Sequence, residues 1–150
     1  MFMENLDEII NFAIEREKEA VAFYNDLHKK SKFDGQKVML KEFENMEKGH
    51  IVILENIRKK GFEKIEEKKV QDLHISDYVV EVEPSENMSF QDIIILAMKK
   101  EEAAKKLYTD LAKQFSESES GKLFERLAAE ETEHKLKFEK IYDDEILKEN

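Results

Sequence analysis

The segment AIEREKEAVAFY (residues 13–24) decides the fold, because a related segment, AMKKEEAAKKLY, follows 84 residues later at residues 97–108. The same offset relates LKEFENMEKGH (residues 40–50) to FERLAAEETEH (residues 124–134). In all four segments, buried-type positions recur at alternating steps of three and four, which is typical of the inner face of a helix in a bundle. The simplest interpretation is a duplicated helical hairpin.

Turn residues separate the four helices. We predict a break at Asp34-Gly35 between the first two helices, an end of the second helix at Gly61, and a turn at residues 116–121 between the last two. Because both connections within the pairs are short, each pair is expected to form an antiparallel hairpin.

The stretch from Gly61 to Ser89 is longer and fits a crossover between the two hairpins. Within it, residues 78–84 (YVVEVEP) are expected to be extended, and Ser89 is a good N-cap for the third helix, with Asp92 at the N3 position. The sequence therefore predicts an all-α, antiparallel four-helix bundle, with residues 1–150 forming a single domain.

Composition excludes several classes of protein. The hydrophobic fraction of 41% is too high for a disordered chain, and no apolar run approaches the roughly 20 residues of a membrane span. A net charge of −10 argues against nucleic acid or an anionic membrane as a partner. The absence of cysteine rules out disulfides, thiolate catalysis and Cys-ligated clusters. The N-terminus has no secretion-signal pattern, so a cytoplasmic location is expected.

Ionisable residues lie inside the apolar seams, near the middle of each helix. They are Glu17, Glu47, His50, Glu101, Glu131 and His134. Four carboxylates in a bundle core would cost several kcal/mol each if uncompensated. Two protonated histidines cannot neutralise four negative charges, whereas two divalent cations can, and each histidine then binds through a neutral nitrogen. The seams therefore predict a metal site.

The spacing of these residues supports that prediction. Glu47–His50 and Glu131–His134 are i, i+3 pairs, so both side chains of each pair share one helix face. Each partner helix adds one glutamate, Glu17 or Glu101, which completes the ligand pattern of a dimetal helical bundle. We predict two metal ions per chain, with iron favoured; oxygen and imidazole ligands also accept manganese or zinc. The same six residues are the candidate catalytic residues.

The four quoted segments resemble the helices of the rubrerythrin family. Residues 13–24 and 97–108 look like its first and third helices, residues 124–134 like its fourth, and residues 40–50 are a looser match to its second. The resemblance implies a ferritin-like bundle whose di-iron centre reacts with peroxide or dioxygen, with the six seam residues as ligands.

The chain departs from the rubrerythrin pattern at two points. It has no cysteine and so no rubredoxin module, which implies a separate electron donor. In rubrerythrin peroxidases a further glutamate lies three residues after the third-helix ligand, but here that position is Ala104, and its repeat counterpart is Ala20. Glu102 lies about 100° around the helix from Glu101 and is a poor substitute. These departures imply a symmetric site of the ferritin and bacterioferritin type.

The predicted function is oxidoreductase chemistry in which Fe(II) is oxidised by peroxide or dioxygen, and manganese catalase chemistry is a variant of it. Two alternatives stay open: an iron store or buffer, and a redox-silent bundle in which metal serves only as a staple. A homo-oligomer is expected, with a dimer favoured.

Several further residues have two interpretations. Tyr24 and Tyr108 are either core aromatics or partners of a ligand carboxylate. Asp26 and Asp110 either orient a histidine or lie on a solvated face. Glu130, next to the fourth-helix ligand, is expected to be a surface charge.

Overall fold

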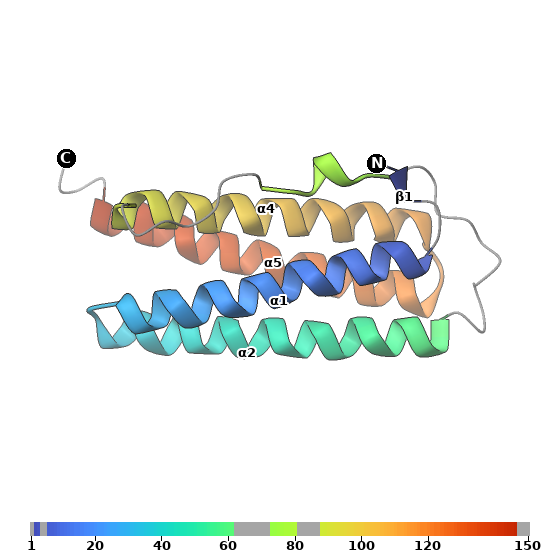
Figure 1. Cartoon of the computed structure of the whole chain (residues 1–150), viewed down its shortest axis with the longest axis horizontal. Helices are drawn as coiled ribbons and strands as arrows, with labels where there is room; N and C mark the ends of the chain where they lie inside the picture. Colours follow the sequence, from blue (N-terminus) through green and yellow to red (C-terminus); the bar gives the residue numbers. More distant parts are fainter. Residues whose placement is uncertain (1, 4–5, 62–72, 81–87, 147–150) are drawn as a thin grey trace. The chain divides into compact units, whose positions relative to one another are not determined.

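The computed structural model describes residues 2–3, 6–61, 73–80 and 88–146, and most of these residues are helical (Figure 1). The long helices are α1 (Leu6–Lys30), α2 (Asp34–Asn56), α4 (Phe90–Gln114) and α5 (Glu119–Ile141). The all-α prediction is confirmed, and so is the pairing into two hairpins, since α1 packs on α2 and α4 packs on α5.

The first hairpin lies in a compact unit of residues 2–73. Its helices face each other through apolar seam residues that are fully buried, among them Ile10, Ala13 and Leu54. The predicted break at Asp34-Gly35 is wrong by a few residues, because both residues lie in the first turn of α2. The acidic side chain of Asp34 suits the positive end of the helix dipole, and the N-cap residue before it makes no side-chain cap bond.

The second helix continues beyond Asn56 as a π-helical turn, η1 (Ile57–Gly61). The described helical structure thus reaches Gly61, where the sequence predicted the end of the helix.

The second hairpin lies in a separate compact unit that begins at His74. The predicted N-cap of α4 is confirmed: the amide of Asp92 donates to Ser89 Oγ at 3.1 Å, and the Asp92 carboxylate accepts from the Ser89 amide at 3.4 Å. The predicted turn at residues 116–121 is shorter in the structure. Ser118 caps α5 by accepting from the amide of Gly121 at 3.0 Å, and α5 ends in a π-helical turn, η3 (Tyr142–Ile146).

The described parts of the crossover are short. Strand β2 (Leu73–His74) pairs with β1 (Phe2–Met3), and a 3-10 turn, η2 (Ile75–Asp77), follows. The predicted extended segment falls partly outside the described residues, at residues 81–84; residues 79–80 have no regular structure, and Tyr78 lies in a turn.

Tyr78 anchors this part of the chain to α4. Its side chain is buried, its hydroxyl donates to Asp110 Oδ2 at 2.7 Å, and the ammonium of Lys106 lies 5.5 Å from its ring centre. Lys106 also approaches Asp77 at 3.9 Å. The part of the crossover around Tyr78 is therefore held against the C-terminal part of α4 by a charge-assisted hydrogen bond and a nearby cation.

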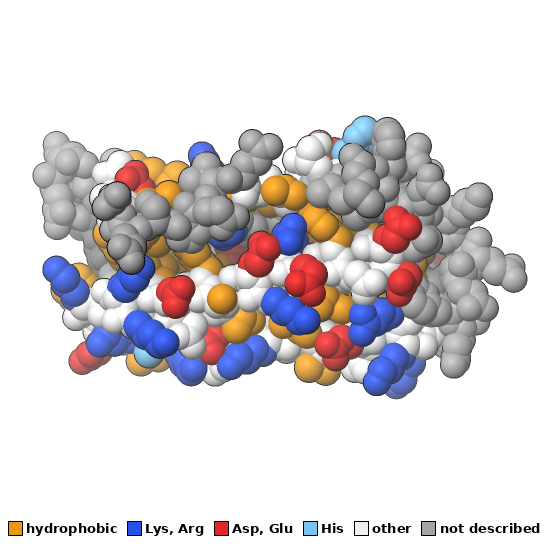
Figure 2. Space-filling view, in the orientation of Figure 1, with side chains coloured by type: hydrophobic (Ala, Val, Ile, Leu, Met, Phe, Trp, Pro, Cys, Tyr) orange, Lys and Arg blue, Asp and Glu red, His pale blue; other side chains and the backbone are white. Residues whose placement is uncertain are grey.

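The surface of the first hairpin carries charges of both signs (Figure 2). Figure 2 shows acidic and basic side chains interspersed over the face of α1 and α2 that it presents. None of the described helices has a stretch long and apolar enough to cross a membrane. The single domain and the cytoplasmic location stay predictions.

Candidate metal centre

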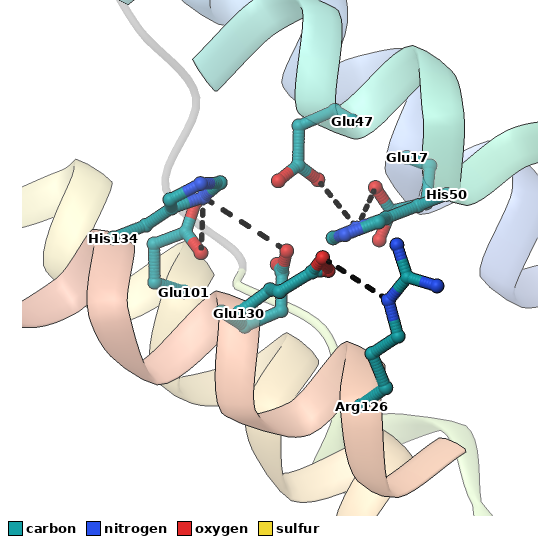
Figure 3. Close-up of polar contacts among 8 residues, drawn as sticks. Glu17, Glu47, His50, Glu101, Arg126, Glu130 and His134 are labelled. Carbon is teal, nitrogen blue, oxygen red and sulfur yellow. Dashed lines mark hydrogen bonds and ion pairs between the residues drawn. The ribbon is translucent and has the colours of Figure 1, made fainter. Parts of the chain in front are cut away.

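The first hairpin brings three of the predicted ligands together. Glu17 comes from α1, and Glu47 and His50 come from α2; their exposed fractions are 2%, 0% and 2%. His50 Nδ1 lies 3.4 Å from Glu17 Oε2 and 3.8 Å from Glu47 Oε2 (Figure 3). These positions follow from the seam, because a residue between apolar neighbours on a helix face has to point inward.

The second hairpin repeats this arrangement with its own three residues. Glu101 comes from α4, and Glu131 and His134 come from α5, all at most 2% exposed. His134 Nδ1 lies 3.5 Å from Glu101 Oε2 and 3.9 Å from Glu131 Oε1 (Figure 3). The distances in the two hairpins agree within 0.1 Å, so the repeat in the sequence is a repeat in geometry as well. We call Glu17, Glu47 and His50 the first triad, and Glu101, Glu131 and His134 the second triad.

These distances suit ligands that share a cation. They are longer than the usual hydrogen-bond spacing of about 2.7–3.2 Å. Two ligand atoms that each lie about 2.1 Å from one ion, at tetrahedral or octahedral angles, are about 3.0–3.4 Å apart. Within each triad one ligand atom per residue lies within 4.8 Å of the others, so a small contraction would close the set around an ion.

The charges of each triad also suit ligands that share one cation. Two carboxylates and one neutral imidazole carry a charge of −2, which one divalent cation neutralises. Carboxylate oxygen and imidazole nitrogen are donors that iron, manganese and zinc all accept. Each triad alone thus has the donor types and the charge for one divalent ion, in a buried position that limits access of water.

Two tyrosines on the same seams as the ligands, Tyr24 and Tyr108, are also buried. Tyr24 and Tyr108 are 1% exposed and pack on aromatic rings; Tyr24 meets Phe43 edge-on at 5.8 Å, and Tyr108 stacks on Phe124 at 6.5 Å. Both side chains are therefore part of the core, which fits either interpretation of these tyrosines.

The two aspartates differ from each other. Asp26 is exposed, in line with a solvated face, whereas Asp110 accepts the hydrogen bond of the Tyr78 hydroxyl. This bond explains a buried phenol in the crossover rather than the orientation of a histidine.

The two glutamates that flank the ligands have basic partners of their own. Glu102 Oε2 lies 2.8 Å from Lys135 Nζ, so this carboxylate is held by a lysine on α5, and its pKa is lowered mainly by that hydrogen bond. The prediction that Glu130 is a surface charge is only partly right. Its side chain is 17% exposed and accepts from Arg126 at 3.4 Å (Figure 3).

Sequence reasoning missed one buried carboxylate, Glu44 on α2. It is 1% exposed, and its Oε2 lies 3.2 Å from Lys41 Nζ and 2.9 Å from Lys48 Nζ. The lysines hold the pKa of Glu44 below its usual value, with the hydrogen bond from Lys48 as the largest cause. The sequence shows a pair of lysines at −3 and +4 around this glutamate, which predicts the ion pairs but not the burial.

Comparisons with known proteins agree with this geometry. Residues 92–150, which include nearly all of α4, all of α5 and the second triad, match the Rubrerythrin family profile. The chain is also similar to a crystal structure from Thermotoga maritima, described as a ferritin-like diiron-carboxylate protein. The TM-score is 0.80 at 18% identity, over 96% of this chain and 97% of that chain. No curated protein matches the sequence.

These findings establish the class of fold. The chain has the ferritin-like four-helix fold, and its predicted resemblance to rubrerythrin is confirmed over residues 92–150. The 150 residues contain no cysteine, so they hold no rubredoxin module.

Proposed function

We propose that the two triads bind two metal ions, with iron favoured, and that the protein is an oxidoreductase in which Fe(II) is oxidised by peroxide or dioxygen. The observation that carries the proposal is the duplication of one buried set, two glutamates and one histidine, with the same distances in both hairpins. The family match and the ferritin-like fold support it.

The residues would contribute in distinct ways. Iron held by the triads would supply one electron per ion to the oxidant. Glu47 and Glu131 lie in the core and can bind through one or both oxygens, so they can adjust as the charge at the site changes. His50 and His134 can bind in neutral form through Nδ1, which faces the carboxylates in both hairpins.

The surroundings of the triads suit a symmetric site. Ala104 and Ala20 stand one turn after Glu101 and Glu17, so neither hairpin offers a fourth carboxylate at that position. Glu102 is engaged with Lys135. A chain without cysteine has to receive electrons from Fe(II) itself or from a separate donor, and a homodimer is the assembly we expect.

The proposal is tested by metal titration followed by oxidation. Fe(II) is added to the metal-free protein under anaerobic conditions, and bound ions are counted per chain; peroxide or air is then added, and formation of Fe(III) is followed by absorbance. We expect two tightly bound ions and rapid oxidation. Glu131→Gln should weaken binding and slow oxidation, whereas Glu133→Gln, which removes an exposed charge two residues away, should change neither.

The other outcomes point to the two alternatives. Two ions that do not respond to either oxidant would indicate a structural staple. Many ferric ions retained per chain would indicate a store. Fewer than two sites, or equal behaviour of the two variants, would refute the dimetal centre.

A further inference from the structure

Glu44 is a buried carboxylate on α2 whose hydrogen bonds are incomplete. Its Oε2 is bonded to the two lysines, while its Oε1 is buried and accepts no hydrogen bond among the described residues. Lys41 and Lys48 are about half exposed, at 49% and 55%. One oxygen of this carboxylate is thus held by groups that reach into solvent, and the other is buried without a hydrogen-bond donor among the described residues.

The position of Glu44 relates it to the first triad. It precedes Glu47 by three residues on α2, so the two carboxylates lie on one side of the helix and one turn apart. Glu44 is the one of these two carboxylates that is bonded to partly exposed ammonium groups, those of Lys41 and Lys48.

The second hairpin lacks this arrangement, although it duplicates the ligands. The offset of 84 residues places Ala128 at the position of Glu44 and Thr132 at that of Lys48. Thr132 Oγ1 donates to the backbone oxygen of Ala128 at 2.8 Å. Helix pairing in this fold is thus achieved with alanine at that position, and the carboxylate of the first hairpin needs another explanation.

We propose that Glu44 is a transit site that holds a divalent cation on its way to the first triad. The proposal rests on the proposed function, because it takes the triad to be a metal site. The carboxylate is kept ionised by the lysines, and carboxylate oxygen is a hard donor suited to a divalent ion. An arriving cation displaces an ammonium from Oε2, and the ammonium swings into water on its flexible stem; Oε1 is then available as a second donor to the ion. The ion then passes to Glu47, one turn along the helix.

The test follows the rate at which Co(II) enters the metal-free, full-length protein. Binding is observed by stopped-flow absorbance, and the final number of ions per chain is measured separately. Glu44→Gln keeps the shape and removes the charge, so it should slow association about tenfold and leave two ions bound at the end. Glu42→Gln removes an exposed charge from the same helix and is the matched control, with a rate close to that of the parent.

A second variant separates transit from a purely structural ion pair. Lys48→Gln removes a group that competes with the cation for Glu44, so loading should become faster; Lys37→Gln, on the same helix outside the cluster, controls for the loss of positive charge. A structural ion pair predicts instead that both Glu44→Gln and Lys48→Gln lower the melting temperature and leave the rate unchanged.

The results distinguish the two proposals. If the parent binds two ions and Glu44→Gln loads as fast as Glu42→Gln, the transit site is refuted and the dimetal centre stands. A Lys48→Gln variant that loads no faster than Lys37→Gln would also overturn the transit site. If the parent binds no Co(II), the proposed function fails, and the transit site fails with it.

Discussion

Replacing Glu47 by glutamine should stabilise the metal-free protein and at the same time weaken its response to metal. The Glu47 side chain is fully buried, and one of its oxygens lies within 4.8 Å of an oxygen of Glu17 and a ring nitrogen of His50. Glutamine has nearly the same shape but no charge. In the metal-free protein the change therefore removes like-charge repulsion. In the metal-loaded protein it removes a ligand of the ion.

The magnitude follows from these distances. Two unit charges 4.8 Å apart repel by about 3.5 kcal/mol at an effective dielectric constant of about 20. Protonation and the nearby histidine relieve part of this repulsion, so we expect a net gain of about 1–3 kcal/mol in the free energy of unfolding. For a chain of this length each kcal/mol corresponds to roughly 2–4 °C in Tm.

Bound metal should stabilise the parent more than it stabilises Glu47→Gln. An ion at 100 times its Kd stabilises the folded state by about 2.7 kcal/mol per site. The parent should gain this for each ion bound, whereas Glu47→Gln should lose much of the gain from the ion at its own triad. The advantage of the variant over the parent in the free energy of unfolding should therefore shrink or reverse when metal is added.

The assay is thermal unfolding followed by circular dichroism, in chelator and in excess Mn(II), with the exposed Glu42→Gln as control. A metal-free Glu47→Gln protein that melts below both the parent and the control would refute the argument. So would a variant that gains as much from Mn(II) as the parent does.

Three further predictions concern the scaffold. Gly121→Ala should lower the free energy of unfolding by about 1–3 kcal/mol, since an added Cβ would overlap the backbone oxygen of Phe115. Gly49→Ala should raise it by about 0.5–1 kcal/mol, because Gly49 lies inside α2 with no atom within 4 Å of the added carbon. Urea denaturation measures the free energy of unfolding of both glycine variants. If both variants were stabilised, or both destabilised, the two predictions would be contradicted. The pKa of Tyr78 is raised, mainly by burial and also by its bond to Asp110, so its stabilising effect is present below about pH 10 and lost as the pH rises above that value. In urea titrations, the free energy of unfolding of Tyr78→Phe should therefore fall less steeply above pH 10 than that of the parent. If it fell equally steeply in both proteins, this role of Tyr78 would be refuted.

The seams explain why so much of the molecule follows from its sequence. Glu17 has apolar neighbours three and four positions away on both sides, so a helix that buries those neighbours buries the carboxylate too. The common offset of 84 residues then relates one hairpin to the other. The burial of all six predicted ligands was accessible by this reasoning.

Features outside the seams were not accessible in the same way. Glu44 stands beside the seam with lysines at −3 and +4, a pattern that usually indicates a solvated helix face, and its burial depends on tertiary packing. The start of α2 at Asp34 lacks a side-chain cap, so the chain carries no local signal for that boundary. The contact between Tyr78 and Asp110 joins residues 32 positions apart, which no local pattern indicates.

The completeness of each triad within its own hairpin has a consequence for biosynthesis. All three residues of the first triad lie on α1 and α2, so they can meet before α4 and α5 have been translated and released. Contacts between neighbouring helices form quickly because the loops to be closed are short. The nascent chain can thus bring two carboxylates and one imidazole together before the later helices leave the ribosome, and under the proposed function the two ions can bind one at a time.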